Sequence, residues 1–231
     1  MIDIRRFKDL GTFRNEWLDA NYHFSFSHYR DPTRLGHGKL RVWNDDTIRA
    51  GTGFDPHGHR DMEIITYVRT GAITHRDSLG NEGRTEAGDV QVMSAGSGVQ
   101  HSEYNKEETE TTLFQIWIEP AEKGGEPGWG ARQFPKADRS GKWAVLASGD
   151  SHDDALPIRQ DAHVLGATLK SGETLDYEVR AGRYGYLVVA AGSVEVNGEV
   201  LEARDGAAVT GAEALQLKGL QDAEIVFVDT I

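Results

Sequence analysis

Residues 57–81 read HGHRDMEIITYVRTGAITHRDSLGN, and this stretch decides the fold class. The run Ile64–Val68 is rich in β-branched and aromatic side chains, which favour strands over helices. Gly71 ends that run, and the turn-forming residues Ser78–Asn81 end the next one. The stretch therefore predicts two short strands followed by a tight hairpin.

The same alternation of short strands and turn signals continues along most of the chain. Further runs of this kind are Val90–Met93, Thr112–Ile118, Tyr186–Val189, Ser193–Val196 and Glu224–Val228. Asn197-Gly198 lies between SVEV and EVLEA and predicts a second hairpin, because both residues tolerate a positive φ. Only a short helix is expected, over Phe13–Ala20. Many short strands separated by turns indicate an all-β fold, a sandwich or barrel with few short helices.

The composition excludes several classes of protein. The chain has 231 residues with 25 Lys and Arg against 37 Asp and Glu, a net charge of −12, which argues against direct contact with nucleic acid. The absence of cysteine excludes a disulfide scaffold, a thiol nucleophile and a cysteine-ligated metal. No apolar run approaches the ~18 residues that cross a membrane. The N-terminal residues MIDIRRFKDLG lack the apolar stretch of a secretory signal, so we expect a cytoplasmic protein without a membrane partner.

A change in composition divides the chain near its middle. The segment Glu119–Gly141 is rich in proline, glycine and charge. We therefore expect an N-terminal domain over residues 1–120, a linker over 121–140 and a C-terminal domain over 141–231. The order strand, glycine, hairpin, glycine or aspartate, strand recurs in both halves and indicates weak repeats. Most histidines precede the linker, so a second copy would lack the chemistry of the first.

Two short motifs predict a metal site. His57-Gly58-His59 and His101-Ser102-Glu103 each place two ligand-type side chains two residues apart, and such side chains share one face of a strand. If both pairs face one barrel interior, three imidazoles and one carboxylate converge. These ligands suit Fe, Mn, Co, Ni, Cu or Zn. A six-coordinate ion held by four of them keeps two positions for water, substrate or O2.

The spacing of these motifs resembles the paired motifs of the cupin superfamily. The first set comprises Gly51, His57, His59, Glu63 and Gly71, and the second comprises Gly88, Ser94-Ala95-Gly96, His101 and Asn105. The departures are a longer gap between Glu63 and Gly71, a serine, Ser94, where proline is usual, and a longer gap between Gly96 and His101. Within the superfamily the chain resembles the pirin family. The segments that carry this resemblance are HFSFSHYRDP (23–32), HGHRDMEIITYV (57–68), HRDSLGN (75–81), AGDVQVMSAGSGVQHSEYN (87–105) and LFQIWIEP (113–120).

The resemblance implies two cupin-type β-barrels face to face, a bicupin, with one metal in the N-terminal barrel. It implies four metal ligands, which are His57, His59, His101 and Glu103. Many cupins instead use the carboxylate at the position of Glu63, whose strand parity matches that of His57 and His59. The pirin pattern favours Glu103, and Glu63 is then expected to orient a ligand imidazole. Iron(II) is the first expectation for the metal, with Mn, Co, Ni, Cu and Zn as alternatives.

The chain looks most like the bacterial pirin-like proteins that act as quercetinases. This implies a metal-dependent dioxygenase of the quercetin 2,3-dioxygenase type, which opens the flavonol ring with O2 and releases CO. Glu103 would be the catalytic base, and the partners would be a planar aromatic substrate and O2, with the protein a monomer. An alternative from the same resemblance is a regulatory protein that acts through a protein partner, like the pirin transcriptional cofactors. A third is a small-molecule cupin enzyme of another reaction type.

The other histidines are expected to have structural or solvent-exposed places. His75 lies in a hairpin strand and is expected at the rim of the barrel or in a structural role. Three lie in or beside an aromatic-rich segment, which favours core packing: His23, His28 and His37. Two lie in polar sequence and are expected in solvent: His152 and His163. Met93 and Phe114 are expected inside the barrel.

Overall fold

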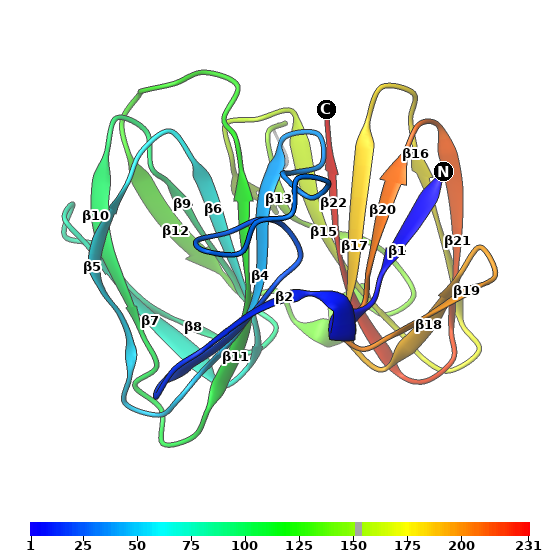
Figure 1. Cartoon of the computed structure of the whole chain (residues 1–231), viewed down its shortest axis with the longest axis horizontal. Coiled ribbons are helices and arrows are strands. Elements are labelled where there is room, and N and C mark those ends of the chain that lie inside the picture. The colour runs from blue at the N-terminus through cyan, green and yellow to red at the C-terminus, as the bar shows by residue number, and fades with distance from the viewer. Residues whose placement is uncertain (151–153) are drawn as a thin grey trace. The chain divides into compact units, whose positions relative to one another are not determined.

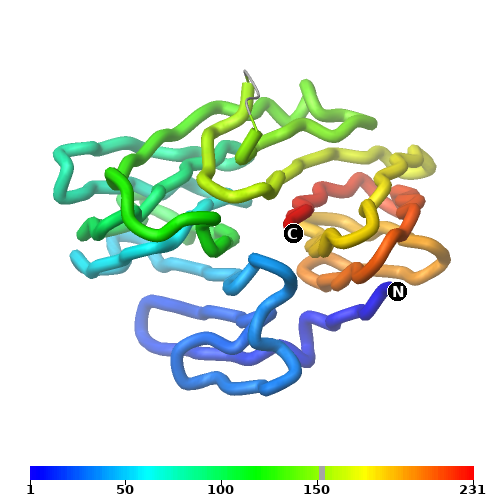
Figure 2. Tube along the Cα trace, turned by 90° about the horizontal axis from the view of Figure 1, so that it is seen from above, coloured from blue at the N-terminus to red at the C-terminus, as the bar shows by residue number. Residues whose placement is uncertain are grey.

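The computed structural model describes residues 1–150 and 154–231, and strands dominate it (Figure 1). The chain forms two compact units. The histidine unit comprises Gly11–Phe134 and Leu156–Gln160, and the C-terminal unit comprises Met1–Leu10, Pro135–Ala155 and Asp161–Ile231. The first strand of the chain therefore belongs with its last residues. Figure 2 shows this blue N-terminal strand beside an orange segment, since β1 (Ile2–Arg5) pairs with β20 (Gly206–Thr210).

The histidine unit contains two antiparallel sheets. The larger has the strand order β12-β9-β6-β11-β4-β3-β2 and the smaller the order β5-β10-β7-β8. The larger sheet consists of β2 (Gly11–Arg14), β3 (Leu18–Tyr22), β4 (Leu40–Ile48), β6 (Glu63–Thr70), β9 (Val90–Ser94), β11 (Thr111–Ile118) and β12 (Gly128–Arg132). The smaller consists of β5 (Gly53–His59), β7 (Ala72–Asp77), β8 (Glu82–Glu86) and β10 (Val99–Tyr104). The unit also includes the short strand β14 (Leu156–Pro157).

Apolar side chains from both sheets form the core of the histidine unit. Ile73 of the smaller sheet packs with Ile48, Val68 and Leu113 of the larger one, and all four are buried. Burial of one such side chain stabilises a fold by about 1.5–3 kcal/mol. Met93 is buried in an apolar cluster with Ile64, which agrees with the expectation that it lies inside. Phe114 is also buried, but it follows the core residue Leu113 by one position on β11, so it lies on the opposite face of the sheet and its expected place inside the barrel is wrong.

The C-terminal unit repeats this plan. Its larger sheet has the order β1-β20-β17-β22-β15-β13 and its smaller sheet the order β16-β21-β18-β19. The remaining strands of the larger sheet are β13 (Ala144–Ser148), β15 (Ala162–Leu169), β17 (Tyr184–Ala191) and β22 (Ala223–Thr230). The smaller sheet consists of β16 (Thr174–Val179), β18 (Ser193–Val196), β19 (Glu199–Glu202) and β21 (Glu213–Gly219). Two short 3-10 helices complete the described part of the chain: η1 (Phe7–Asp9) and η2 (Lys136–Arg139).

The strand orders confirm the internal repeat. The series β9-β6-β11-β4 corresponds to β20-β17-β22-β15, and β5-β10-β7-β8 corresponds to β16-β21-β18-β19. The counterpart of the histidine-bearing strand β10 is thus β21. That strand contributes Leu215 and Leu217 to the apolar core of its unit. The second copy has the same strand order as the first, but its core cluster consists of apolar side chains, most of them aliphatic.

Both predicted hairpins are present, and the predicted helix is wrong. Ser78–Asn81 connect β7 to β8, and Asn197-Gly198 connect β18 to β19 with positive φ values of 49° and 89°. The residues predicted as a helix, Phe13–Ala20, instead belong to the hairpin of β2 and β3. The side chain of Asn15 accepts the N–H groups of Trp17 and Leu18 at 2.9 and 2.8 Å, which stabilises the turn.

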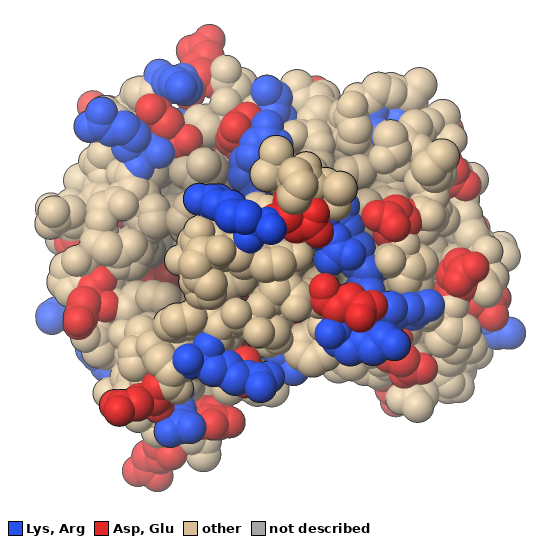
Figure 3. All heavy atoms as spheres, in the orientation of Figure 1, with Lys and Arg blue, Asp and Glu red and all other residues tan. Residues whose placement is uncertain are grey.

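The all-β prediction is therefore confirmed. A search of the described residues finds no helix with the length and apolar character of a membrane span. On the face that Figure 3 shows, acidic and basic side chains are interspersed. Such mixed surfaces favour solubility over attraction to one strongly charged partner.

Candidate metal centre

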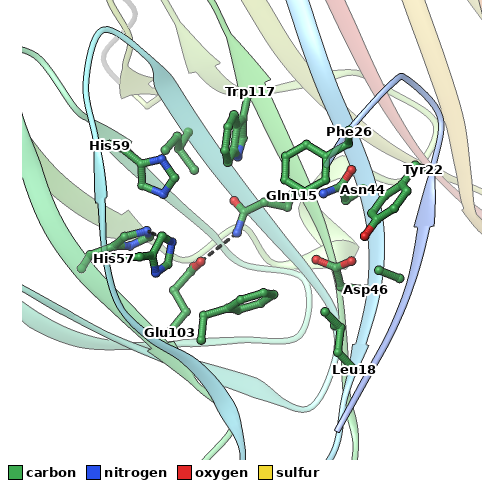
Figure 4. A pocket seen from close by; sticks show the side chains of 14 residues that line it. Leu18, Tyr22, Phe26, Asn44, Asp46, His57, His59, Glu103, Gln115 and Trp117 are labelled. Atoms are coloured by element: carbon green, nitrogen blue, oxygen red, sulfur yellow. Dashed lines mark hydrogen bonds between the residues drawn. The ribbon is translucent and has the colours of Figure 1, made fainter. Parts of the chain in front are cut away.

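Three imidazoles converge where β5 and β10 pair. The antiparallel register places His101 opposite His57, and His59 follows His57 by two residues on β5. One ring nitrogen from each of the three lies within 4.8 Å of the others. Figure 4 shows His57 and His59 directed toward the same space. This three-histidine group could hold a metal ion.

The hydrogen bond of His57 determines which of its nitrogens is available to a metal. Nδ1 lies 2.7 Å from the carbonyl oxygen of Asp55. A carbonyl oxygen only accepts, so Nδ1 carries the proton and Nε2 has the lone pair. This Nε2 lies 3.1 Å from Nε2 of His101. Two nitrogens bound at right angles to one ion at ~2.1 Å lie about 3 Å apart, so the pair fits a shared metal.

Burial and mutual repulsion favour the neutral form of two of these imidazoles. Desolvation, with a smaller effect of His101 and His57, lowers the pKa of His59 to about 4. Desolvation, with a smaller effect of His57 and His75, lowers the pKa of His101 to about 3. Metals bind neutral imidazole, so at neutral pH neither ring has to lose a proton before an ion binds.

Glu103 lies in a network of amide and hydroxyl side chains. It follows His101 on β10, and the register against β5 shifts between the two residues. Nε2 of Gln91 donates to Oε1 of Glu103 at 2.7 Å, and Nε2 of Gln115 donates to Oε2 at 2.8 Å (Figure 4). The hydroxyl of Thr66 lies 3.1 Å from Oε1. These contacts fix the orientation of a buried carboxylate.

The three histidines and Glu103 line one cavity of about 200 Å³. Most of its other lining side chains are apolar or aromatic: Leu18, Ala20, Tyr22, Phe26, Phe54, Ile64 and Trp117. Trp117 lies edge-on to His59, with 4.9 Å between the ring centroids and 82° between the planes. Apolar walls next to a few convergent polar groups are typical of small-molecule sites, and aromatic walls favour flat ligands.

Comparison with known proteins identifies the family. The family model described as Pirin matches residues 4–118, and the model described as Quercetinase C-terminal cupin domain matches residues 145–230. The pirin-like protein of Caulobacter vibrioides is 61% identical over 230 residues, 99% of this chain and 99% of that protein. The chain belongs to the pirin family. The prediction of two cupin domains is thereby confirmed.

Two comparisons with Escherichia coli, one of sequence and one of structure, extend the result. The quercetin 2,3-dioxygenase of strain K12 is 40% identical over 99% of this chain and 98% of that protein. The crystal structure of the bacterial pirin YhhW in complex with nickel(II) is 38% identical, with a TM-score of 0.93 over 100% of this chain and 99% of that one. Nickel is bound in that relative.

In this chain, Glu63 does not point toward the three-histidine group. The hydroxyl of Ser94 donates to its Oε2 at 2.6 Å. The parity argument assumed one unbroken strand, but β5 ends at His59, β6 begins at Glu63, and Asp61 between them has a φ of 53°. The lining of the cavity, as far as the structure describes it, includes Glu103 and not Glu63.

β4 contributes two polar side chains to the cavity wall that sequence reasoning missed. Asn44 and Asp46 line the cavity, and Figure 4 shows both across it from His57 and His59. Oδ1 of each is buried and has no hydrogen-bond partner among residues 1–150 and 154–231. Burial, with the charges of Asp45 and Glu103, holds the pKa of Asp46 well above its ordinary range. The available signal was two polar residues at alternate positions of a strand face that is otherwise apolar, with Leu40, Val42 and Ile48.

The remaining histidines occupy varied environments. His75 is fully buried, which excludes the rim position and leaves the structural role that was expected as the alternative. His23 is buried against Trp43, as core packing predicts, with 6.2 Å between the ring centroids. His28 is exposed beside Phe13 and Tyr22, so the core packing expected for it is wrong, and the half-buried His37 forms an isolated bridge with Leu40. His163 lies 3.1 Å from a carboxylate oxygen of Asp150, and the expectation for His152 lies outside the described residues.

Proposed function

We propose that the chain is a metal-dependent flavonol dioxygenase of the quercetin 2,3-dioxygenase type. The observation that carries the proposal is the three-histidine group beside a buried carboxylate in an aromatic-walled cavity. A relative with 40% identity over almost the whole chain bears the name quercetin 2,3-dioxygenase. The proposed ligands are His57, His59, His101 and Glu103, with iron(II) as the first candidate metal and Mn, Co, Ni, Cu or Zn as alternatives.

A flavonol suits this cavity because its chelating atoms lie at one edge of a flat ring system. The 3-hydroxyl and 4-carbonyl oxygens would face the three-histidine group, and the ring carrying them would lie between the aromatic walls. A cavity of about 150 Å³ holds a benzene ring. The cavity here, about 200 Å³, holds one substituted ring, and the rest of a three-ring ligand would extend beyond it.

Glu103 is the proposed general base of the reaction. When bound, a divalent metal lowers the pKa of a hydroxyl that it coordinates. Glu103 then accepts the proton of the flavonol 3-hydroxyl, while Gln91 and Gln115 hold its carboxylate in place. The aromatic wall that includes Trp117 excludes water from the reacting ring. Overall, both atoms of O2 enter the product, the central ring opens and one ring carbon leaves as CO.

The test measures three quantities with protein loaded separately with each candidate metal. Aerobic incubation with quercetin should remove its near-visible absorbance, consume one O2 and release one CO per quercetin. Free metal without protein and the variant His57→Ala/His101→Ala are the controls for non-enzymatic oxidation. Unchanged absorbance with every metal, or loss of absorbance without CO, would refute the proposed reaction.

A further inference from the structure

A buried imidazole connects the three-histidine group to a carboxylate outside the cavity. Nε2 of His75 lies 3.1 Å from Oδ2 of Asp77, and its Nδ1 lies 3.4 Å from Nδ1 of His101. The pairing of β7 with β10 places Asp77 opposite His101 and His75 opposite Glu103. On its other side, the His75 ring is stacked on Trp129, with 4.9 Å between the centroids and 7° between the planes. The ring therefore has little freedom to turn.

Asp77 determines where His75 carries its proton. Oδ1 of Asp77 accepts the backbone N–H groups of Leu79 and Asn81 at 2.9 and 3.0 Å, and Oδ2 accepts from the Asn81 amide at 2.9 Å. These donors and His75 hold the pKa of Asp77 below its ordinary value, against the opposing effect of burial. An ionised carboxylate only accepts. His75 must therefore donate from Nε2, and a neutral imidazole then has its lone pair on Nδ1.

The lone pair of His75 in turn selects the tautomer of His101. A contact between two Nδ1 atoms is a hydrogen bond only if one of them donates, and His75 Nδ1 is the acceptor. His101 therefore carries its proton on Nδ1 and has its lone pair on Nε2. That Nε2 is the atom 3.1 Å from Nε2 of His57, and two bare nitrogens at this distance need a cation between them, so this tautomer belongs to the metal-bound protein.

We propose that His75 is a positioning residue, held by Asp77, that keeps His101 in the tautomer whose Nε2 faces the metal. Without this acceptor, His101 could place its proton on Nε2, where it would occupy the position of the ion. The inference rests on the metal-binding part of the proposed function and not on flavonol cleavage. Asp77 thus determines the tautomer of His101 through His75, which contacts both.

The first test reads the tautomers directly. Long-range ¹H–¹⁵N correlation spectra of the full-length ¹⁵N-labelled chain, metal-free and loaded with zinc(II), distinguish protonated from bare ring nitrogens. We expect His75 to carry its proton on Nε2 in both samples and His101 to carry its proton on Nδ1 in the zinc-loaded sample. A proton on Nδ1 of His75 in either sample would overturn the proposal, and so would a proton on Nε2 of His101 in the zinc-loaded one. The metal-free spectrum decides the tautomer of His75 even if the chain binds no zinc, an outcome that would count against the proposed function instead.

The second test uses a matched pair of variants. In His75→Asn the amide oxygen can occupy the place of Nδ1 and accept from His101, whereas His75→Phe keeps a ring on Trp129 but has no acceptor. Loss of a group that orients a metal ligand typically weakens metal binding about 10–100-fold. Chelator competition should show this loss in His75→Phe and a clearly smaller one in His75→Asn. Equal zinc affinities of the two variants, with metal-free unfolding midpoints that show both to be folded, would overturn the proposal.

Discussion

Nε2 of His57 and Nε2 of His101 face each other at 3.1 Å across two paired strands. Each atom reaches that position only when β5 and β10 are paired, so the unfolded chain has no such site. A metal that binds there should therefore stabilise the folded chain. At a free concentration of 100 times its Kd, the expected gain is about 2.7 kcal/mol.

Denaturant unfolding with zinc(II) and with EDTA checks this prediction. The variant His57→Ala/His101→Ala serves as the control and should show no difference between the two conditions. A zinc-dependent shift of equal size in that variant would place the stabilising metal elsewhere.

Gln115 should be needed for full activity because it orients the carboxylate of Glu103. Replacing it in Gln115→Leu removes the donor 2.8 Å from Oε2 of Glu103. By analogy with other groups that orient metal ligands, we expect about a 10–100-fold loss in kcat/KM for quercetin and in metal affinity. Gln100→Leu is a matched control, because Gln100 lies on the same strand as Glu103 but is exposed. Similar kinetics in the two variants would contradict the role given to Gln115.

Asn44 and Asp46 should make the cavity select ligands with hydrogen-bond donors. Their buried Oδ1 atoms lack partners, and a ligand hydroxyl directed at one of them would gain about 0.5–1.5 kcal/mol. Metal-loaded protein should therefore bind quercetin more tightly than 3-hydroxyflavone, which keeps the chelating oxygens but has no other hydroxyl. Titration calorimetry on wild type and Asp46→Leu measures the difference. If the preference for quercetin is unchanged in the variant, Asp46 does not contact the ligand.

Two glutamates should give stability profiles of opposite slope against pH. Burial raises the pKa of Glu63, so the folded chain binds this proton more strongly than the unfolded one. Its contribution is present at low pH and is lost as the pH rises through the raised pKa, so Glu63→Gln should gain stability relative to wild type as the pH rises above ~4.5.

Glu119 provides the comparison. Hydrogen bonds from Arg41 lower its pKa, so its contribution is present above the unfolded value and is lost as the pH falls through the lowered one. Glu119→Gln should therefore lose stability relative to wild type as the pH rises from 3 to 6, by a modest amount because the side chain is partly exposed. Urea unfolding of the metal-free proteins from pH 3 to 7 measures both profiles. Parallel profiles of the two variants would contradict the assigned shifts.

Local signals were sufficient for the strands, the hairpins and the histidine motifs. Asn197-Gly198 needs only its own φ preferences to specify a turn, and HxH places two imidazoles on one face by strand geometry alone. The helix predicted over Phe13–Ala20 failed because its apolar spacing was weak and the Asn15 turn was not recognised. Glu63 was expected on the same strand face as His57 and His59 because all three have odd numbers. This alternation does not continue past Asp61, where the strand is interrupted.

Features that depend on pairing between distant strands could not be read from the sequence. Gln91 and Gln115 contact Glu103 only because β9 and β11 both flank β6 in the larger sheet. His75 is buried because Trp129 covers it, and Trp129 lies in the segment that composition alone assigned to a linker. Such contacts depend on the register between paired strands. The spacing of residues along the chain does not predict that register.

The correspondence between β10 and β21 has a consequence for the history and redesign of this chain. A duplicated frame needs a cavity in only one copy, so the other is free to exchange polar interior positions for aliphatic ones. Leu215 and Leu217 lie at interior positions of the second copy and belong to its apolar core. The C-terminal copy is therefore a ready scaffold for engineering. It offers a place to build a metal site one side chain at a time without altering the three-histidine group.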